Sequence, residues 1–326
     1  MRELRFVCAQ PAIDYYTWQI EVMIHNFIEM GINPNQMDIV CWKQNNVIPE
    51  KWLKLANHYN YVRFFFYDDT RETRHYISSI RPNILKQHWA AHPELENSVI
   101  FYHDNDIAFT KPINWDQFMH DEKWYGSDVR WYISHDYILG KGEDVLNEMC
   151  RIVDIDKQLV KDNELNCIGA QTLMKNVDYS FWDNLEKDSE RLFKEITDLN
   201  NKKIEEDKQK IEEEVKEGKP RRAPYHEVQI WCSDMWSLLW NAWKRGIETV
   251  CHDDFLFSWG TSSEADWNKH NIFHNAGVTT EKGGLFYKAL YMNKLPYNEN
   301  LEIKPNTASW NYWQNIQKTA KKSILL

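Results

Sequence analysis

The order in which short apolar runs and amphipathic stretches follow each other along the first hundred residues constrains the fold more than any other feature. The apolar runs have the length and the β-branched and aromatic content of strands, which we predict at 4–9, 37–42, 61–67 and 98–103. Apolar side chains at helical spacing, or a proline in the first turn, predict helices at 18–30, 49–58 and 81–91. This alternation indicates an α/β, Rossmann-like domain with a mostly parallel central sheet and flanking helices. Further strands are predicted at 124–133 and 167–174, and a helix at 179–199.

Composition excludes several classes of protein. With 43% hydrophobic and 14% aromatic residues, the chain of 326 residues has too much apolar surface to remain disordered. Its six cysteines form no CxxC pair, which argues against a disulfide framework and against a zinc site. The N-terminal segment lacks the features of a secretory leader, and no apolar run approaches the ~18 residues of a membrane span. We therefore expect a cytoplasmic protein with no membrane span.

The acidic motif Asp104-Asn105-Asp106 directly follows the strand predicted at 98–103. In open α/β sheets, ligands bind at the carboxyl ends of the strands. Two carboxylates separated by one residue can both reach a single hard divalent cation, Mn²⁺ or Mg²⁺. Such a cation neutralises the charge that develops on a diphosphate leaving group. The motif therefore predicts a metal site for a phosphorylated ligand, and two solvated loop acids are the alternative interpretation.

The motif and its surroundings, HDNDIAFTKPI, resemble the GT-A glycosyltransferases, in which a metal-binding DxD motif follows a core strand and precedes an apolar residue and a proline. Three later segments extend the resemblance over roughly residues 4–290. The segment NCIGAQTLM, which begins at Asn166, is similar to the stretch that cradles the donor sugar in retaining enzymes. WCSDMW, around Asp234, is similar to the segment with an acidic residue beside the reacting carbon. HNAG, which begins at His274, resembles a late His-x-x-Gly whose histidine completes the metal shell.

The resemblance implies a role for each matching residue. The residues that would hold Mn²⁺ or Mg²⁺ are Asp104, Asp106 and His274. Those that would contact the nucleotide-sugar donor are Arg81, Asn105, Asn166, Gly169 and Gly277. Those that would act at the reacting carbon are Asp234 and Gln171.

Four of these residues also have a simpler interpretation, which the residues alone leave open. His274 could be a packed histidine, and Gln171 a side chain on a strand surface. Asp234 could cap a helix, as could Ser233 beside it. Arg81 could form a salt bridge to Asp68 or Asp69.

The sequence also departs from the family pattern in two places. The lysine and the Pro-Trp pair that follow His-x-x-Gly are not reproduced, and Lys282 with Gly283-Gly284 occupies that neighbourhood. An extra residue stands between Asn166 and Gly169. The contact to the diphosphate and the register of the sugar-cradling segment are therefore the least specified parts of the resemblance.

The function that the resemblance implies is metal-dependent transfer of a hexosyl or pentosyl unit from a nucleotide sugar, a UDP-sugar first of all, with retention at the anomeric carbon. The acceptor hydroxyl could belong to a saccharide, a protein, or a hydroxylated base of modified phage-type DNA. The net charge of −10 opposes binding to phosphate backbones. A few basic residues keep the DNA acceptor open, namely Lys219, Arg221, Arg222, Lys321 and Lys322.

Two other functions compete with this one. The first is a carbohydrate-binding protein of GT-A shape without catalysis. The second is a phosphatase of the haloacid dehalogenase type, which also uses a DxD motif after a strand. That family carries its motif near the first strand and a Thr or Val two places beyond the second Asp, where this chain has Ala108.

The segment NNKKIEEDKQKIEEEVKEGKPRR, residues 200–222, is almost wholly charged. Its apolar residues Ile204, Ile211 and Val215 fall on one helical stripe, so we predict an exposed helix or helical hairpin. It is either a solvated face or an arm that binds a partner or the acceptor. The predicted organisation is one catalytic domain made of 1–199 and 223–295, with 200–222 as a charged helical insertion and 296–326 as a C-terminal extension.

Overall fold

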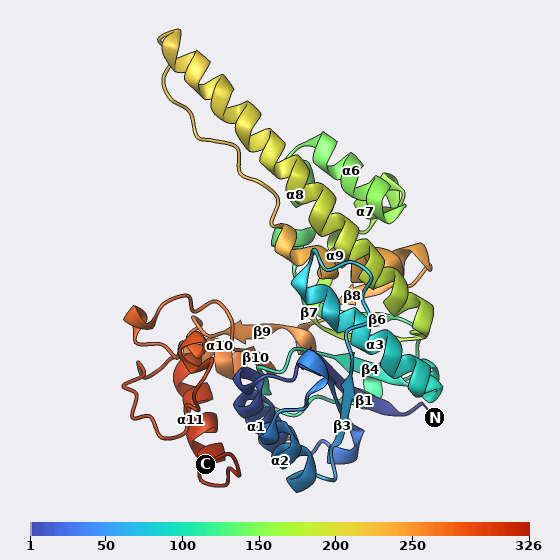
Figure 1. The fold of residues 1–326 in the computed structure, drawn as a ribbon, viewed down its shortest axis with the longest axis vertical. Helices are drawn as coiled ribbons and strands as arrows, with labels where there is room; N and C mark the ends of the chain where they lie inside the picture. The colour runs from blue at the N-terminus through green and yellow to red at the C-terminus, as the bar shows by residue number, and fades with distance from the viewer. Residues whose placement is uncertain (1) are drawn as a thin grey trace.

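A seven-stranded sheet forms the centre of the computed structural model, which describes residues 2–326 (Figure 1). The strand order is β3-β2-β1-β4-β7-β6-β8. These strands are β1 Leu4–Pro11, β2 Met37–Trp42, β3 Arg63–Tyr67, β4 Val99–Tyr102, β6 Trp124–Asp128, β7 Ile168–Lys175 and β8 Thr249–Cys251. Within the described sheet, β7 pairs antiparallel with both neighbours and every other adjacent pair is parallel. The prediction of an α/β fold with a mostly parallel sheet is confirmed.

Helices cover both faces of this sheet. One face packs against α3 Ile80–Ala91, α9 Ser233–Lys244 and the start of α8 Tyr179–Lys216, while α6 Glu143–Val153 packs on α8. The other face packs against α1 Asp14–Glu29 and α2 Glu50–His58. Strand β1 shows how the sequence divides between them, because Val7 and Ala9 enter the first core while Phe6 and Cys8 enter the second. The shorter helices are α4 Arg130–Ile133, α5 His135–Leu139, α7 Lys157–Asp162 and α10 Glu264–Lys269.

A second, three-stranded sheet stands beside the first and has the order β5-β10-β9. Its strands are β5 Ile107–Phe109, β9 Phe257–Trp259 and β10 Ile272–His274. Strand β10 pairs antiparallel with β5, so that His274 lies opposite Ile107. This pairing brings a late part of the chain against the residues that follow the acidic motif.

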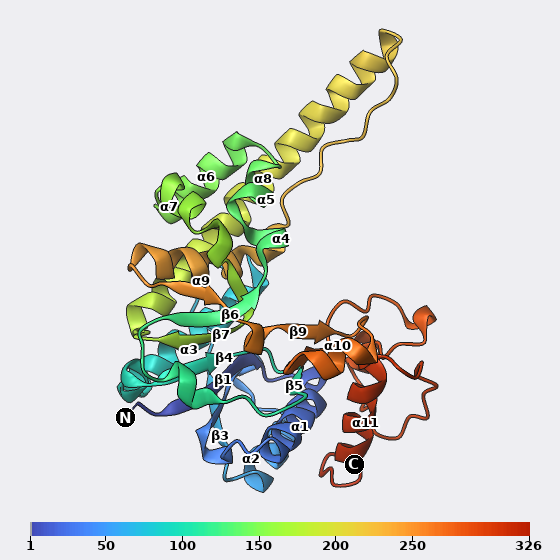
Figure 2. The ribbon, with the colours of Figure 1, turned by 180° about the vertical axis from the view of Figure 1, so that it is seen from behind.

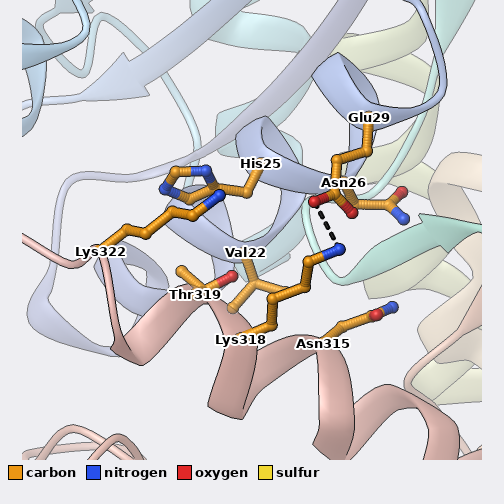
Figure 3. A pocket seen from close by; sticks show the side chains of 8 residues that line it. All are labelled: Val22, His25, Asn26, Glu29, Asn315, Lys318, Thr319 and Lys322. Atoms are coloured by element: carbon orange, nitrogen blue, oxygen red, sulfur yellow. Dashed lines mark ion pairs between the residues drawn. The ribbon is translucent and has the colours of Figure 1, made fainter.

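The end of the chain packs on α1 through α11 Ala308–Ala320. Figure 3 shows the contact between the two helices, where Lys318 forms an ion pair of 2.6 Å with Glu29. Nearby, the buried Glu21 accepts hydrogen bonds from Tyr297 at 2.7 Å and Ser323 at 2.6 Å. The segment predicted as a C-terminal extension is therefore fixed to the first helix by buried polar and apolar contacts.

Helix α8 runs for 38 residues and projects well beyond the rest of the molecule, and the chain returns along it in an extended conformation (Figures 1 and 2). The helix predicted at 179–199 thus continues through most of the charged segment, and the alternative of a helical hairpin is wrong. Ile211 is buried, while Val215 is exposed. The return is held by Arg222, whose guanidinium lies 2.8 Å from Asp207. We call α8 beyond residue 200 together with its return to residue 226 the arm.

The strand predicted at 124–133 is also shorter than expected. It ends at Asp128, whose carboxylate accepts a hydrogen bond from the backbone N–H of Arg130 and so favours a turn into α4. Among the described residues, no helix combines the length and the apolarity that crossing a membrane requires.

Candidate active site

Asp104, Asp106 and His274 meet where the two sheets adjoin. The two carboxylates follow β4 and precede β5, and His274 ends β10. His274 Nε2 lies 3.5 Å from Asp104 Oδ2 and 3.4 Å from Asp106 Oδ1. One ligand atom from each of the three residues lies within 4.8 Å of the others. Two carboxylate oxygens and an imidazole nitrogen at this spacing fit a divalent cation, so the residues predicted as metal ligands are brought together.

Two cationic side chains lie against these carboxylates. Arg81 Nη1 is 2.7 Å from Asp104 Oδ1, and Lys288 Nζ forms an ion pair with Asp106 Oδ2. Burial acts to raise the pKa of Asp106, but Lys288 and then His274 outweigh it and hold this pKa well below its usual range. Burial acts to lower the pKa of Lys288, and Asp106 outweighs it and raises this pKa above its usual range. Asp106 is therefore ionised and Lys288 is charged.

Asp234 is tied to the same cluster through Arg81, with which it also forms an ion pair. It lies in the first turn of α9, and its Oδ1 accepts a hydrogen bond of 2.8 Å from the hydroxyl of Tyr76. Its side chain makes no capping hydrogen bond, and the Ser233 hydroxyl donates to the carbonyl of Ile230 instead. Arg81 thus bridges Asp104 and Asp234, and the alternative of a salt bridge from Arg81 to Asp68 or Asp69 is wrong.

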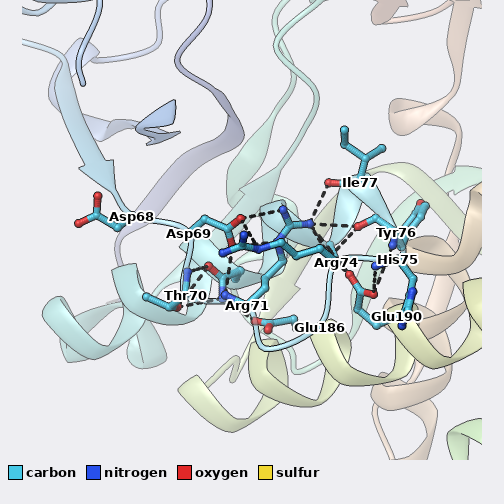
Figure 4. A network of polar contacts seen from close by, with 12 residues as sticks. Asp68, Asp69, Thr70, Arg71, Arg74, His75, Tyr76, Ile77, Glu186 and Glu190 are labelled. Atoms are coloured by element: carbon cyan, nitrogen blue, oxygen red, sulfur yellow. Dashed lines mark hydrogen bonds and ion pairs between the residues drawn. The ribbon is translucent and has the colours of Figure 1, made fainter. Parts of the chain in front are cut away.

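A buried polar network fixes the loop that carries Tyr76 (Figure 4). Glu190 of α8 accepts hydrogen bonds from the backbone N–H groups of His75 at 2.7 Å and Tyr76 at 3.3 Å, and from the Ser79 hydroxyl. Arg71 donates to Asp69 at 2.9 Å and to the carbonyl of Tyr76 at 3.1 Å. Helix α8 therefore positions one wall of the site as well as forming the arm.

A cavity of about 240 Å³ opens beside the cluster, and Arg81, Asp104, Asp234 and His274 all line it. The rest of its wall is mostly apolar and aromatic, with contributions from Tyr102, Tyr132, Ile168, Trp182, Leu185, Trp231, Met235, Leu238 and Trp259. Polar groups thus converge on one end of an otherwise apolar cavity, which is the usual composition of a site for a small molecule.

Gln171 is fully buried behind His274, and its Nε2 lies 3.4 Å from His274 Nδ1. We predict that it acts at the reacting carbon; in the structure its amide lies against the imidazole, and Gln171 is not among the residues that line the cavity. A histidine that binds a metal through Nε2 carries its proton on Nδ1. Gln171 would therefore orient it by turning its amide oxygen, Oε1, toward Nδ1, and Oε1 has no other hydrogen-bond partner among the described residues.

Gly169 and Gly277 belong to the walls of the site. Gly169 lines the cavity, and a β-carbon there would lie 2.7 Å from Val129 Cγ2, so glycine allows β7 and its neighbours to pack closely. Gly277 has a φ of +84°, which glycine adopts without strain, and follows Ala276 of the cavity wall.

The two asparagines predicted to bind the donor have different positions. Asn105 is buried, and its Nδ2 has no hydrogen-bond partner among the described residues. It lines a second hollow, which shares Arg81 and Asp104 with the cavity. Asn166 lies in the turn before β7, where its amide donates to Asn163 and its carbonyl accepts from Thr249.

Three functional candidates were missed by the sequence reasoning. Lys288 forms an ion pair with Asp106, whereas Lys282, which is nearer to His274 in the sequence, is exposed. Trp259 stacks on His274 with ring centroids 6.0 Å apart, and Tyr76 binds Asp234. Lys288 and Asp106 are 182 positions apart, and no local pattern marks the lysine.

No protein-family model matches the chain, and no curated protein sequence matches it either. Several solved glycosyltransferases have a similar fold. The bifunctional glycosyltransferase WbbM has 9% sequence identity and a TM-score of 0.47 over 99% of this chain, which spans only 52% of that protein. The galactosyltransferase LgtC, solved with donor and acceptor sugar analogues, has 9% identity and a TM-score of 0.40 over 98% of this chain and 97% of its own. Mouse xyloside xylosyltransferase 1 has 8% identity and a TM-score of 0.38 over 84% of this chain and 97% of its own. Similarities as distant as these do not assign a function to this chain.

Proposed function

We propose that this protein is a metal-dependent glycosyltransferase of the GT-A type, which moves a sugar from a nucleotide-sugar donor to an acceptor hydroxyl. The observation that carries the proposal is the convergence of Asp104, Asp106 and His274 at the polar end of the cavity, with Arg81 and Lys288 against the two carboxylates. Asp104, Asp106 and His274 would hold Mn²⁺, or Mg²⁺. The imidazole ligand favours Mn²⁺, because Mg²⁺ prefers an all-oxygen shell. When bound, the cation neutralises negative charge on the departing diphosphate.

Arg81 and Lys288 are the side chains that would bind the diphosphate. Both are cations held next to the predicted metal ligands by ion pairs. A guanidinium and an ammonium at this place would each donate charge-assisted hydrogen bonds to phosphate oxygens. Lys288 would thereby take the role of the lysine that follows His-x-x-Gly in the family pattern and is not reproduced at that place in this sequence. Asn105, with its unpartnered amide, is a further donor toward the nucleotide.

Asp234 would stabilise positive charge at the reacting carbon of the sugar. It is one of the few charged groups in a mostly apolar cavity wall, and a carboxylate in such surroundings interacts strongly with a developing cation. Arg81 and Tyr76 hold this carboxylate in place, so it needs no rearrangement during the reaction.

The resemblance of the segments at 166–169 and 274–277 to retaining enzymes leads us to propose retention at the anomeric carbon. In that case the leaving diphosphate accepts the acceptor proton on the same face of the sugar. In an inverting enzyme Asp234 would deprotonate the acceptor instead, so substitution of Asp234 does not separate the two. The anomeric proton coupling of the product does: from an α-linked donor we expect an α-linked product, and a β-linked product would refute retention while leaving the metal site standing.

We propose a saccharide rather than DNA as the acceptor. Of the basic residues that kept DNA open, Arg222 forms ion pairs with Asp207 and Glu214, and Lys219 with Glu217. Charges that are already neutralised within the arm contribute little to phosphate binding. The hydroxylated DNA base stays an alternative acceptor for the tests below.

A screen of UDP-, GDP- and dTDP-sugars with and without Mn²⁺ tests the proposed function. Binding of the donor at about 100 times its Kd should stabilise the protein by about 2.7 kcal/mol, which a thermal melt detects. Release of the nucleoside diphosphate should depend on the metal. If no nucleotide sugar raises the melting temperature or is turned over, the function is wrong.

A further inference from the structure

A row of aromatic rings extends from His274 along the cavity and beyond it. It consists of four residues, which we call the aromatic row: Trp259, Trp131, Tyr132 and Trp231. Trp259 stacks on His274, and the Trp259 and Trp131 centroids are 6.4 Å apart. Tyr132 and Trp231 stack with an interplanar angle of 18°. In Figure 2, α4, which carries Trp131 and Tyr132, lies between β9 and the foot of the arm.

Two members of the row are unusually exposed. Trp131 is 68% exposed and Trp231 is 60% exposed, whereas tryptophans such as Trp124 and Trp236 are fully buried in the core. An indole ring left in water forgoes the large free-energy gain of its burial. Two such rings beside a cavity therefore indicate a surface that a ligand covers.

The row connects the cavity to two further hollows. Trp231 lines both the cavity and a hollow at the foot of the arm, whose polar groups come from Lys141, Thr197, Asn200, Asn201, His226, Glu227 and Gln229. Trp131 lines a shallower hollow with Asp128, Arg130, Ser134, Tyr137 and Glu164. The two hollows adjoin, because the backbone N–H of Gln229 donates to the Tyr137 hydroxyl at 3.1 Å. The surface beyond the cavity therefore combines flat aromatic faces with amide, hydroxyl and carboxylate groups.

The charges along this surface favour a neutral ligand over a polyanion. Arg130 is neutralised by Asp128, with 2.6 Å between guanidinium and carboxylate. Glu164 and Glu227 add negative charge to the two hollows, and Lys141 adds one positive charge to the hollow at the foot of the arm, so that the charges of the lining residues sum to a negative value. A phosphate backbone would meet repulsion here, whereas sugar hydroxyls can donate to the carboxylates and the apolar faces of sugar rings can cover the indoles.

We propose that the aromatic row binds the acceptor as a neutral oligosaccharide of at least two units. Its rings stack on Trp131 and Trp231, and its terminal hydroxyl points into the cavity toward Asp104 and Asp234. That the bound saccharide is the acceptor rests on the proposed function. That a saccharide binds here rests on the aromatic row and its two hollows. The aromatic row thus determines which sugar chain is extended, while Asp104, Asp106, His274 and Asp234 act on the donor.

The test measures binding to the full-length protein without a donor, so that it does not depend on turnover. The probes are neutral tetrasaccharides of glucose (α1,4 and β1,4), xylose, mannose and N-acetylglucosamine, together with lacto-N-neotetraose and the oligonucleotide dT10. Binding is followed by saturation-transfer NMR and calorimetry for the wild type, Trp131→Ala, Trp231→Ala and the double variant. Tyr61→Ala is the matched control, because Tyr61 is also an exposed aromatic residue and lies between α2 and β3.

We expect at least one tetrasaccharide to bind, each single variant to weaken it roughly two- to tenfold, and the double variant to lose it, with Tyr61→Ala unchanged. Absence of binding for every tetrasaccharide, or equal binding by the double variant, overturns the inference. So does a tighter complex with dT10 that the double variant loses, since that result assigns the row to nucleic acid.

The outcome of the donor screen is independent of this one. A protein that turns over nucleotide sugars with Mn²⁺ but binds no tetrasaccharide refutes the aromatic row and leaves the proposed function intact. A protein that binds a tetrasaccharide through Trp131 and Trp231 but turns over no nucleotide sugar supports the saccharide surface and refutes the proposed function. Circular dichroism of each variant excludes loss of the fold as the cause.

Discussion

The cluster at the edge of the sheet and the arm are both rich in paired charges, yet they use these charges differently. In the arm, Lys219 and Glu217 are both more than 60% exposed at the side chain, and such pairs contribute between 0 and about 1 kcal/mol. In the cluster, the Asp106 side chain is 5% exposed and Lys288 lies against it. Charges with little water around them interact much more strongly. The comparison teaches that the arm's charges keep a projecting helix solvated, whereas the cluster's charges are held close together and shielded from water, as the proposed metal and diphosphate site requires.

Replacement of one carboxylate in each region gives the largest expected difference in turnover between the two regions. Asp106→Asn removes a predicted metal ligand and leaves Lys288 without its anionic partner, so we expect Mn²⁺-dependent turnover to fall by about 10³-fold or more. Asp207→Asn in the arm should leave turnover unchanged. The release of nucleoside diphosphate measures both, with circular dichroism to verify folding. Full activity of Asp106→Asn would refute the metal role.

A matched pair of lysines sharpens the comparison. Lys288→Ala should lower kcat/KM for the donor about 10- to 100-fold, because a charge-assisted hydrogen bond to phosphate is lost. Lys219→Ala should have no effect, since its ammonium is paired with Glu217 in solvent. Lys288→Arg should restore part of the loss. Steady-state kinetics with varied donor concentration measures kcat/KM for each variant. Equal effects of the two alanine variants would contradict the assignment of Lys288 to the diphosphate.

A glutamine in each region tests positioning rather than charge. Gln171→Ala should weaken Mn²⁺ binding by about tenfold, because the amide that lies against His274 Nδ1 no longer orients the imidazole. Gln209→Ala, on the exposed surface of the arm, is the control. Electron paramagnetic resonance of free Mn²⁺ gives both affinities. An unchanged Mn²⁺ affinity in Gln171→Ala would leave the glutamine with a packing role alone.

The smallest expected effect comes from removing most of the arm. Replacing residues 205–224 by a short Gly-Ser linker should keep the fold and leave donor hydrolysis within about twofold, because the lost ion pairs are exposed and contribute little. Thermal unfolding and turnover of the shortened chain measure this. An insoluble or unfolded product would show that the buried Ile211 and its neighbours belong to the core of the domain.

Much of the fold follows from local pattern in the sequence. The strand predicted at 37–42 coincides with β2, and the helix predicted at 49–58 differs from α2 by one residue, since strand and helix periodicities are read over a few neighbouring side chains. The end of α8 was less predictable. Its charged residues are strong helix formers and pair four positions apart, as Lys194 does with Asp198, so the helix continues past the point where its apolar face ends.

The site was predictable only in part, and the reason is its topology. Asp104 and Asp106 stand out because they directly follow a strand. His274 was found through a resemblance, since pairing of β10 with β5 joins segments that no periodicity relates. Lys288 comes from an irregular segment and had no signal at all. The same holds for Trp131 and Trp231, whose exposure depends on tertiary contacts and is not encoded in their neighbours.

The pairing of β5 with β10 has a consequence for the order in which the molecule matures. This pairing places His274 opposite Ile107, next to Asp106, and contacts between segments so distant in sequence are slow to close. During synthesis, strands β1 to β4 leave the ribosome long before β10 does. We therefore expect the nascent protein to acquire much of its framework before the proposed metal ligands are brought together. Under the proposed function, metal uptake would then report the completion of folding, and an unfinished chain would not bind nucleotide sugar.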